Sequence, residues 1–237
     1  MAGAKGKESS ARSRPKILSI IAPLVLVPLV GVLATLGILY INGDFSARNN
    51  SNGSNVHAVQ SGSNTPAPSS SSSGLPSPSS FKKLSDADLN VSLQYPADWT
   101  QESPQKTAAS SVLGIHSSQQ FGITFNVVRF SDTSSSSISD PNQINQVAIS
   151  QFSGQQGVSN VQLLKPANSQ PTIGGAKWVQ AEAMVIATNG LKFHIATISV
   201  QHNKDYYNIQ VFAPDDYYSE AVQKYIQPML SSWQFLS

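Results

Sequence analysis

The chain has 237 residues, a formal net charge of +2 and no cysteine. The absence of cysteine excludes disulfides, thiolate metal sites, a cysteine nucleophile and a lipid-modified cysteine anchor. Residues 1–16 carry five basic side chains and one acidic side chain, whereas residues 81–237 carry nine basic and eleven acidic ones. The basicity therefore belongs to the amino terminus, and we do not expect the rest of the chain to bind nucleic acid.

Residues 17–41 form an apolar run without a charge. As a helix this run would be roughly 37 Å long, enough to cross a hydrocarbon core of about 30 Å. It is too long for a cleaved signal peptide, although two prolines within it weaken the helix. Five basic residues within 1–16 precede the apolar run, and Arg48 is the one basic residue that closely follows it. The positive-inside rule therefore predicts a single-pass anchor in the cell membrane, with residues 1–16 as a cytoplasmic tail and the carboxyl-terminal part extracytoplasmic.

Residues 42–80 are rich in Ser, Asn, Gly and Pro, as in NNSNGSN and TPAPSSSSSGLPSPSS. Such a segment has too few apolar side chains to offset the entropy of ordering, so we expect a low-complexity, disordered linker. As a flexible coil it would span roughly 35 Å on average. The globular domain is then expected at residues 81–237.

The domain begins with strand signals. Apolar and polar residues alternate from Leu89 to Tyr95, and Pro96, which cannot donate a ladder hydrogen bond, ends the run. Residues 121–127 repeat the alternation, and residues 106–116 are a weaker candidate strand between them. Three strands are therefore expected before residue 128.

A helix is predicted next, because Asp140 is a favourable cap, Pro141 suits the first helical position and Gln143 stands three residues after the cap. Two glycines, at positions 154 and 157, follow its apolar residues. Its predicted apolar face comprises Ile144, Val147, Ala148 and Phe152. This pattern is typical of an amphipathic helix that covers a sheet.

Residues 158–165 and 176–187 read as further strands, and Asn189-Gly190 predicts a tight hairpin to a strand at 191–200. Within 191–200 the apolar parity changes near Ala196, which we interpret as a bulge. A turn at residues 203–204 and a strand around residues 207–211 complete an antiparallel meander.

A final helix is expected from Asp215 and Asp216, whose charges suit a helix amino terminus. Residues 232–236 are a candidate edge strand. One side of the helix should carry Tyr218, Val222, Tyr225 and Met229. The predicted fold class is α+β, an α/β/α sandwich around one mostly antiparallel sheet, preceded by a single transmembrane helix and the disordered linker.

Several of these features together resemble those of a known superfamily. A strand that ends in Tyr-Pro-Ala-Asp-Trp, a mid-chain helix, a long hairpin and a closing helix followed by MLSSWQFL resemble the PsbP and Mog-type α/β/α sandwich superfamily, in particular its bacterial membrane-anchored members. The likeness covers residues 81–237. It implies a fold and not a function, since members range from an extrinsic photosystem II subunit to a Ran-binding nuclear-transport factor. In such a fold Tyr95 and Trp99 are expected to pack at the end of the sheet.

Motifs for chemistry are sparse. Asp86, Asp88 and Asn90 have the opening spacing of a calcium loop, but the positions that require glycine and glutamate hold Val91 and Ala97. No phosphate loop and no nucleophile motif such as GxSxG is present. We predict no catalytic, cofactor-binding or metal-binding residues.

The remaining candidates are histidines and tyrosines. His194 and His202 are expected on the solvated surface, and metal binding by two histidines with Asp205 is the weaker interpretation. Tyr217, Tyr218 and Tyr225 are expected in the core rather than in a ligand-facing patch.

The function predicted is a non-catalytic, extracytoplasmic binding or assembly module with a protein partner, which would meet an edge strand or a helix-free face of the sheet. One alternative is an extrinsic photosystem II-type subunit, if the source is photosynthetic. Another is a cell-envelope hydrolase whose activity depends on His194, His202 and Asp205.

Overall fold

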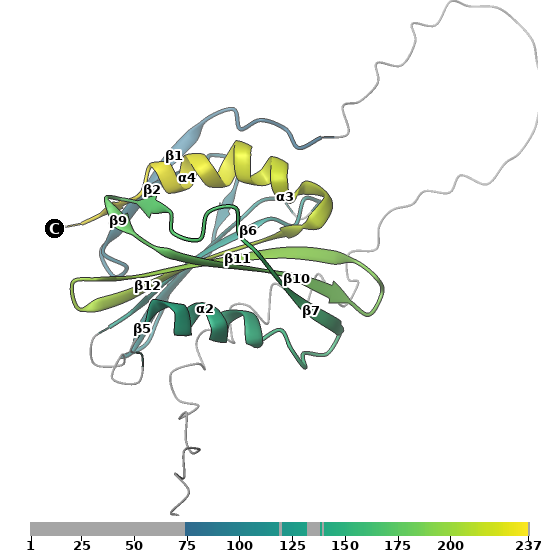
Figure 1. The fold of residues 1–237 in the computed structure, drawn as a ribbon. Coiled ribbons are helices and arrows are strands. Elements are labelled where there is room, and N and C mark those ends of the chain that lie inside the picture. Colours follow the sequence, from purple (N-terminus) through teal and green to yellow (C-terminus); the bar gives the residue numbers. More distant parts are fainter. Residues whose placement is uncertain (1–73, 119, 132–137, 139, 237) are drawn as a thin grey trace, which may run out of the picture.

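The computed structural model describes residues 74–118, 120–131, 138 and 140–236. In Figure 1 a broad antiparallel sheet carries helix α2 (Pro141–Ser150) on one face and a terminal helix on the other. The terminal helix consists of α3 (Asp215–Ala221), the π-helical turn η3 (Val222–Ile226) and α4 (Gln227–Ser231). Helices thus lie on both faces, and the expected helix-free face is not observed.

The predicted tail at 1–16, the predicted membrane span at 17–41 and the first part of the linker lie outside the described residues. Among the helices that are described, none combines the length and the apolarity needed to cross a membrane.

The main sheet has eight strands, all paired antiparallel. Along the path their order is β3 (Thr100–Gln101), β5 (Ser110–His116), β6 (Thr124–Phe130), β12 (Asp205–Pro214), β11 (Lys192–His202), β10 (Val179–Ala187) and β7 (Val158–Leu164). The short strand β4 (Gln105–Lys106) also pairs with β5. The predicted meander at the carboxyl-terminal side of the chain is confirmed.

A second, three-stranded sheet corrects the expectation of one sheet. It contains β1 (Phe81–Asp86), β2 (Val91–Pro96) and β13 (Gln234–Phe235), with β2 in the middle. The predicted strand before Pro96 is β2, and the predicted edge strand after the last helix is β13, but these two pair with each other and not with the main sheet. A short hairpin of β8 (Thr172–Ile173) and β9 (Ala176–Lys177) stands apart from both sheets.

Strand β11 corrects the predicted bulge near Ala196. Its register is continuous with β10 on one side and with β12 on the other. Phe193 and Ile195 pack in the cluster beneath α2, whereas Ile198 and Val200 pack in the cluster beneath the terminal helix. Both faces of β11 are covered, so apolar residues are needed at odd and at even positions along the strand. The change of apolar parity near Ala196 therefore requires no bulge.

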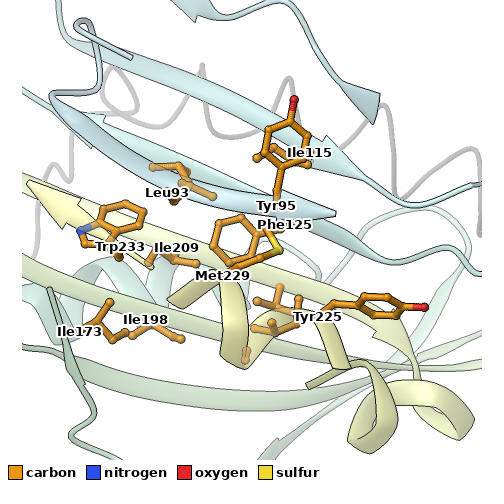
Figure 2. Packing of buried hydrophobic residues seen from close by; sticks show 14 of the residues in the cluster. Leu93, Tyr95, Ile115, Phe125, Ile173, Ile198, Ile209, Tyr225, Met229 and Trp233 are labelled. Atoms are coloured by element: carbon orange, nitrogen blue, oxygen red, sulfur yellow. The ribbon is translucent and has the colours of Figure 1, made fainter. Parts of the chain in front are cut away.

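The larger core lies between the main sheet, the terminal helix and the small sheet (Figure 2). Leu93, Phe125 and Met229, from three different elements, are each no more than 1% exposed. Tyr95 and Trp99 are also buried, and the Trp99 ring lies 5.1 Å from that of Tyr225 between centroids. The predicted packing role of the Tyr-Pro-Ala-Asp-Trp stretch is confirmed.

Helix α2 forms where the sequence predicts it. The Asp140 carboxylate accepts a hydrogen bond from the backbone N–H of Asn142 at 2.9 Å, and Pro141 occupies the first turn. Its buried face contains Ile144, Ala148 and Ile149, but also the polar Asn145.

Asn145 lies at the centre of a buried polar network between α2 and the sheet. Its Oδ1 accepts hydrogen bonds from the hydroxyls of Thr197 and Ser199 at 3.0 and 2.7 Å. Its Nδ2 donates to the carbonyl of Val179 at 2.9 Å, and Asn208 bonds to both hydroxyls. Because these polar groups satisfy one another out of water, the network fixes where α2 sits on the sheet.

We predict that Asn145→Ala lowers the free energy of unfolding by about 2–4 kcal/mol, because two buried hydroxyl donors lose their acceptor. Urea denaturation followed by tryptophan fluorescence measures this, and Gln146→Ala, the exposed neighbour on the same helix, should change stability by less than about 0.5 kcal/mol. Equal effects of the two substitutions would show that the network contributes no stability.

The β8–β9 hairpin turns through two glycines with positive φ, Gly174 at +56° and Gly175 at +78°. A Cβ at Gly174 would lie 2.6 Å from Cδ1 of the buried Trp233, whereas a Cβ at Gly175 would have no atom within 4 Å. The closeness to Trp233 places this turn against the core.

Alanine substitutions at these two glycines distinguish the cost of backbone strain from the cost of steric crowding. Alanine at either position should cost about 1 kcal/mol for the positive φ, but Gly174→Ala should cost a further 1–3 kcal/mol or so because it crowds Trp233. Thermal denaturation of both variants is the measurement. A Gly175→Ala protein as unstable as Gly174→Ala would rule out the steric explanation.

Candidate functional site

A cavity of about 690 Å³ lies between the terminal helix and the main sheet. Ala196 and Ile198 of β11 and Val211 of β12 contribute its sheet side, and Val222 and Ile226 contribute its helix side. A size of this order is typical of pockets for small molecules. Ile198 also belongs to the larger core shown in Figure 2, so the cavity adjoins that core directly.

Polar residues surround the opening of the cavity. Six of them are exposed, so the cavity is open to solvent on this side: Asn168, Thr172, Ser219, Gln223, Gln227 and Ser231. The described residues that line the cavity are Ala167, Asn168, Pro171, Thr172, Ile173, Gln180, Glu182, Ala196, Ile198, Val211, Tyr218, Ser219, Val222, Gln223, Ile226, Gln227, Leu230 and Ser231. Apolar walls with polar groups at the opening are the usual composition of a ligand site.

The helical wall of the cavity is irregular for an identifiable reason. Pro228 has no N–H, and its ring would clash with the carbonyl four residues earlier in a regular α-helix. The preceding turn is π-helical, and the N–H of Gln227 bonds to the carbonyl of Val222, five residues back. The wider turn contributes Val222, Gln223 and Ile226 to the cavity wall. Such turns are frequent at functional sites.

One side of the cavity contains a carboxylate. Oε1 of Glu182 accepts a hydrogen bond from Nε2 of Gln180 at 2.6 Å, and Oε2 lies 3.0 Å from Nε2 of His194. The Glu182 side chain is 11% exposed and the His194 side chain 12%. The imidazole stacks on the Tyr218 ring at 3.4 Å between centroids, and its Nδ1 lies 3.9 Å from Oδ1 of Asp215. Two strands and the start of α3 therefore converge at Glu182.

Tyr218 is held as a neutral phenol. Burial raises the pKa of Tyr218 above its ordinary value, and the nearby Glu182 carboxylate raises this pKa further. Tyr218 lines the cavity, so it presents a ring and a hydroxyl without adding a charge.

The histidines differ from the sequence expectation. His194 is not a solvated surface residue, because Glu182 and Tyr218 enclose its ring. The His202 ring stacks on Phe235 at 3.7 Å between centroids. Strand parity placed His194 outside the core, and a predicted turn placed His202 there. Neither signal could show that the terminal helix and β13 return to cover these side chains.

The weaker metal hypothesis is not supported by the placement of its residues. His194 and His202 lie near opposite ends of β11, and Asp205 pairs with Arg129 at 2.6 Å. In the part of the chain that the structure describes, no three His, Asp or Glu side chains are grouped so that they could hold a metal ion.

The segment with partial calcium-loop spacing serves as a turn. Asp86 accepts from the N–H of Leu89 at 2.9 Å, Asp88 pairs with Lys106, and Asn90 adopts a positive φ of 57°. Each of these side chains or backbones has a structural role between β1 and β2.

The three tyrosines of the terminal helix differ in whether they belong to the core or face a possible ligand. Tyr225 is 3% exposed and belongs to the core, as predicted. Tyr217 is partly buried beside Phe121, with ring centroids 6.4 Å apart. Tyr218 lines the cavity and is the one of the three that a ligand could contact.

Glu182 and Gln180 were not singled out by sequence reasoning. Glu182 is the only charged residue in the strand VQAEAMVIA, and it interrupts an apolar run that becomes the centre of the domain. A lone charge in such a strand was a usable signal, but its histidine partner lies on the next strand and follows only from the hairpin register.

The outer side of the terminal helix is held by residues that the sequence placed in the linker. Leu75 is 2% exposed, and its N–H donates to Oε2 of Glu220 at 2.9 Å. Lys224 donates to the Leu75 carbonyl, and the Tyr225 hydroxyl donates to that of Pro76. Hydrogen bonds from Lys224 and from the Leu75 N–H lower the pKa of Glu220. Leu75 therefore belongs to the packed part of the chain.

No known protein family matches the chain, and no curated protein is similar to it. Among solved structures it is similar to the cyanobacterial PsbP (CyanoP) of Synechocystis, at 13% identity and a TM-score of 0.46, over 72% of this chain and 99% of that one. It is also similar to the Ran-binding protein Mog1p of Saccharomyces cerevisiae, at 12% identity and a TM-score of 0.42, over 67% of this chain and 96% of that one.

A third similar structure is a protein of Bacteroides thetaiotaomicron, at 13% identity and a TM-score of 0.39 over 66% of this chain. The chain spans about half, 48%, of the length of that protein. PsbP and Mog-type proteins are thus among the structures that this chain is similar to, as the resemblance predicted, and the likeness concerns the fold alone.

Leu75→Ala tests the attachment of the linker to the terminal helix. We expect a loss of about 2–4 kcal/mol in the free energy of unfolding, because the side chain leaves a cavity in the core. Urea denaturation is the measurement, with Ser79→Ala, an exposed position on the same segment, as the control. If both variants unfold like the wild type, residues 74–76 do not stabilise the helix.

Proposed function

We propose that this chain is a non-catalytic binding module, held at the extracytoplasmic side of a cell membrane by residues 17–41, and that the cavity beneath the terminal helix is its binding site. The observation that supports the proposal most is the cavity itself, with apolar walls, exposed polar residues at its opening and a hydrogen-bonded carboxylate at one side. The sandwich provides a rigid frame on which such a site keeps its shape.

The geometry around His194 supports binding over hydrolysis. In a hydrolytic triad one imidazole nitrogen faces a carboxylate and the other faces the nucleophile. Here Nε2 faces Glu182 and Nδ1 faces Asp215, so both nitrogens are directed at carboxylates. The hydrolase alternative also required His202, at the other end of β11, and Asp205, which pairs with it at the start of β12.

The edge strand β7 favours a protein partner as a second binding function. This strand is last in the order of the main sheet, and its sequence VSNVQLL carries no charge. Leu163 on this strand is 76% exposed. An uncharged edge with an exposed leucine can pair with an extended segment of another protein. The photosystem alternative rests on the resemblance alone, and no contact within the described residues favours it.

One experiment tests both the orientation and the cavity. Protease added to intact cells that carry the full chain should release a stable fragment that begins between residues 42 and 74, because we expect the linker before Leu75 to be accessible, whereas Leu75 is packed on the terminal helix. Native mass spectrometry of this fragment should detect a bound small molecule. Gln223→Trp, which fills the opening of the cavity, should abolish it, whereas Gln146→Trp on the opposite face should retain it.

Protection of the domain in intact cells would refute the orientation. The same bound mass in the Gln223→Trp fragment, or none in the wild-type fragment, would refute the cavity as the binding site.

A further inference from the structure

The charged group that lines the cavity is an acidic one. Among the described residues that line the cavity, Glu182 is the only ionisable one apart from the phenol of Tyr218, and none of them is a lysine, an arginine or a histidine. The Tyr218 phenol is kept neutral, because burial and Glu182 raise its pKa. A molecule in the cavity therefore meets one carboxylate and no cation.

The Glu182 carboxylate retains capacity to bind a donor. Its two oxygens offer about four acceptor positions, and Gln180 and His194 occupy one on each oxygen. Gln180 and His194 thus hold the carboxylate in one orientation and leave acceptor positions on both oxygens for a donor from a ligand.

The remaining surface of the cavity suits an apolar group. Ile198 and Ala196 on the sheet face Val222 and Ile226 on the helix across the cavity. Contact with these side chains removes apolar surface of the ligand from water, which is favourable and roughly proportional to the area buried. The carboxylate and the apolar walls belong to one cavity, so a single small molecule can engage both.

We propose that the cavity selects small molecules that combine a cationic amine with a compact apolar group, the amine pairing with Glu182 and the apolar group lying against Ile198, Val222 and Ile226. This inference rests on the proposed function of the cavity as a binding site. A carboxylate of low exposure favours a cation over a neutral group of the same shape, and it disfavours an anion by like-charge repulsion.

The proposal is tested with three probes of matched shape: cyclohexylmethylamine, cyclohexylmethanol and cyclohexanecarboxylate. At about pH 8 the amine is protonated and the acid is ionised. Isothermal titration of the full chain in lipid nanodiscs, with empty nanodiscs as the blank, measures each dissociation constant. We expect the amine to bind at least about tenfold more tightly than the alcohol, and the acid to bind most weakly.

Two variants of the same chemistry identify the group responsible. Glu182→Gln removes the charge and keeps the size of the side chain, so the preference for the amine should fall to within about threefold. Glu102→Gln makes the same change on the opposite face of the sheet, beside Gly114, and should keep the full preference. Gln223→Trp should abolish the binding of all three probes, which ties the binding to this cavity.

The outcomes distinguish failure of the proposed selection of amines from failure of the cavity as a binding site. Equal binding of the three probes overturns the selection of amines and leaves the cavity as a site for apolar molecules. A preference that survives in Glu182→Gln overturns the pairing of the amine with Glu182. Binding of none of the probes, or binding that Gln223→Trp does not affect, overturns the selection and the proposed site together.

Discussion

The packing of the terminal helix on the main sheet is the interaction on which the rest of the domain depends. Its buried residues, among them Tyr225 and Met229, close one side of the larger core. Leu75 and its hydrogen bonds to Glu220 and Lys224 hold the same helix from the outer side. Between these two attachments Pro228 widens one turn, and the cavity lies against this turn. The helix therefore stabilises the fold and shapes the candidate site at once.

The two faces of the sheet have different roles. Beneath α2, Asn145 accepts hydrogen bonds from Thr197 and Ser199, so these buried polar groups have a structural role. Beneath the terminal helix Glu182 is only partly satisfied within the protein and borders an open cavity. Strand β11 serves both faces, since its alternate residues belong to the two separate clusters. This division is the physical reason for placing binding on one face.

Much of the fold could be predicted because local signals were strong. Asp140 and Pro141 mark the start of α2, and Asn189-Gly190 marks the hairpin between β10 and β11. The placement of β2 in a small separate sheet could not be predicted, because it depends on the return of the chain after α4. The supposed bulge near Ala196 arose from the same limit: period-two reasoning assumes one buried face, and β11 has two.

Most of the candidate site could not be predicted from the sequence, for a related reason. His194, Glu182 and Tyr218 are separated along the chain and meet only through the β10–β11 register and the docking of α3. None of the three belongs to a motif of fixed spacing. A buried aromatic such as Trp99 can be anticipated from its type, but a cavity depends on which helix covers which strand.

Methyl NMR of the full chain during titration with cyclohexylmethylamine tests the central claim most directly. If the cavity is the binding site, the resonances of Ile198, Val222 and Ile226 shift with a common dissociation constant, while Val112 and Val128, which belong to the cluster beneath α2, stay unchanged. Shifts confined to the α2 face, or to Leu163 on β7, would contradict the account, because the ligand would then bind away from the terminal helix.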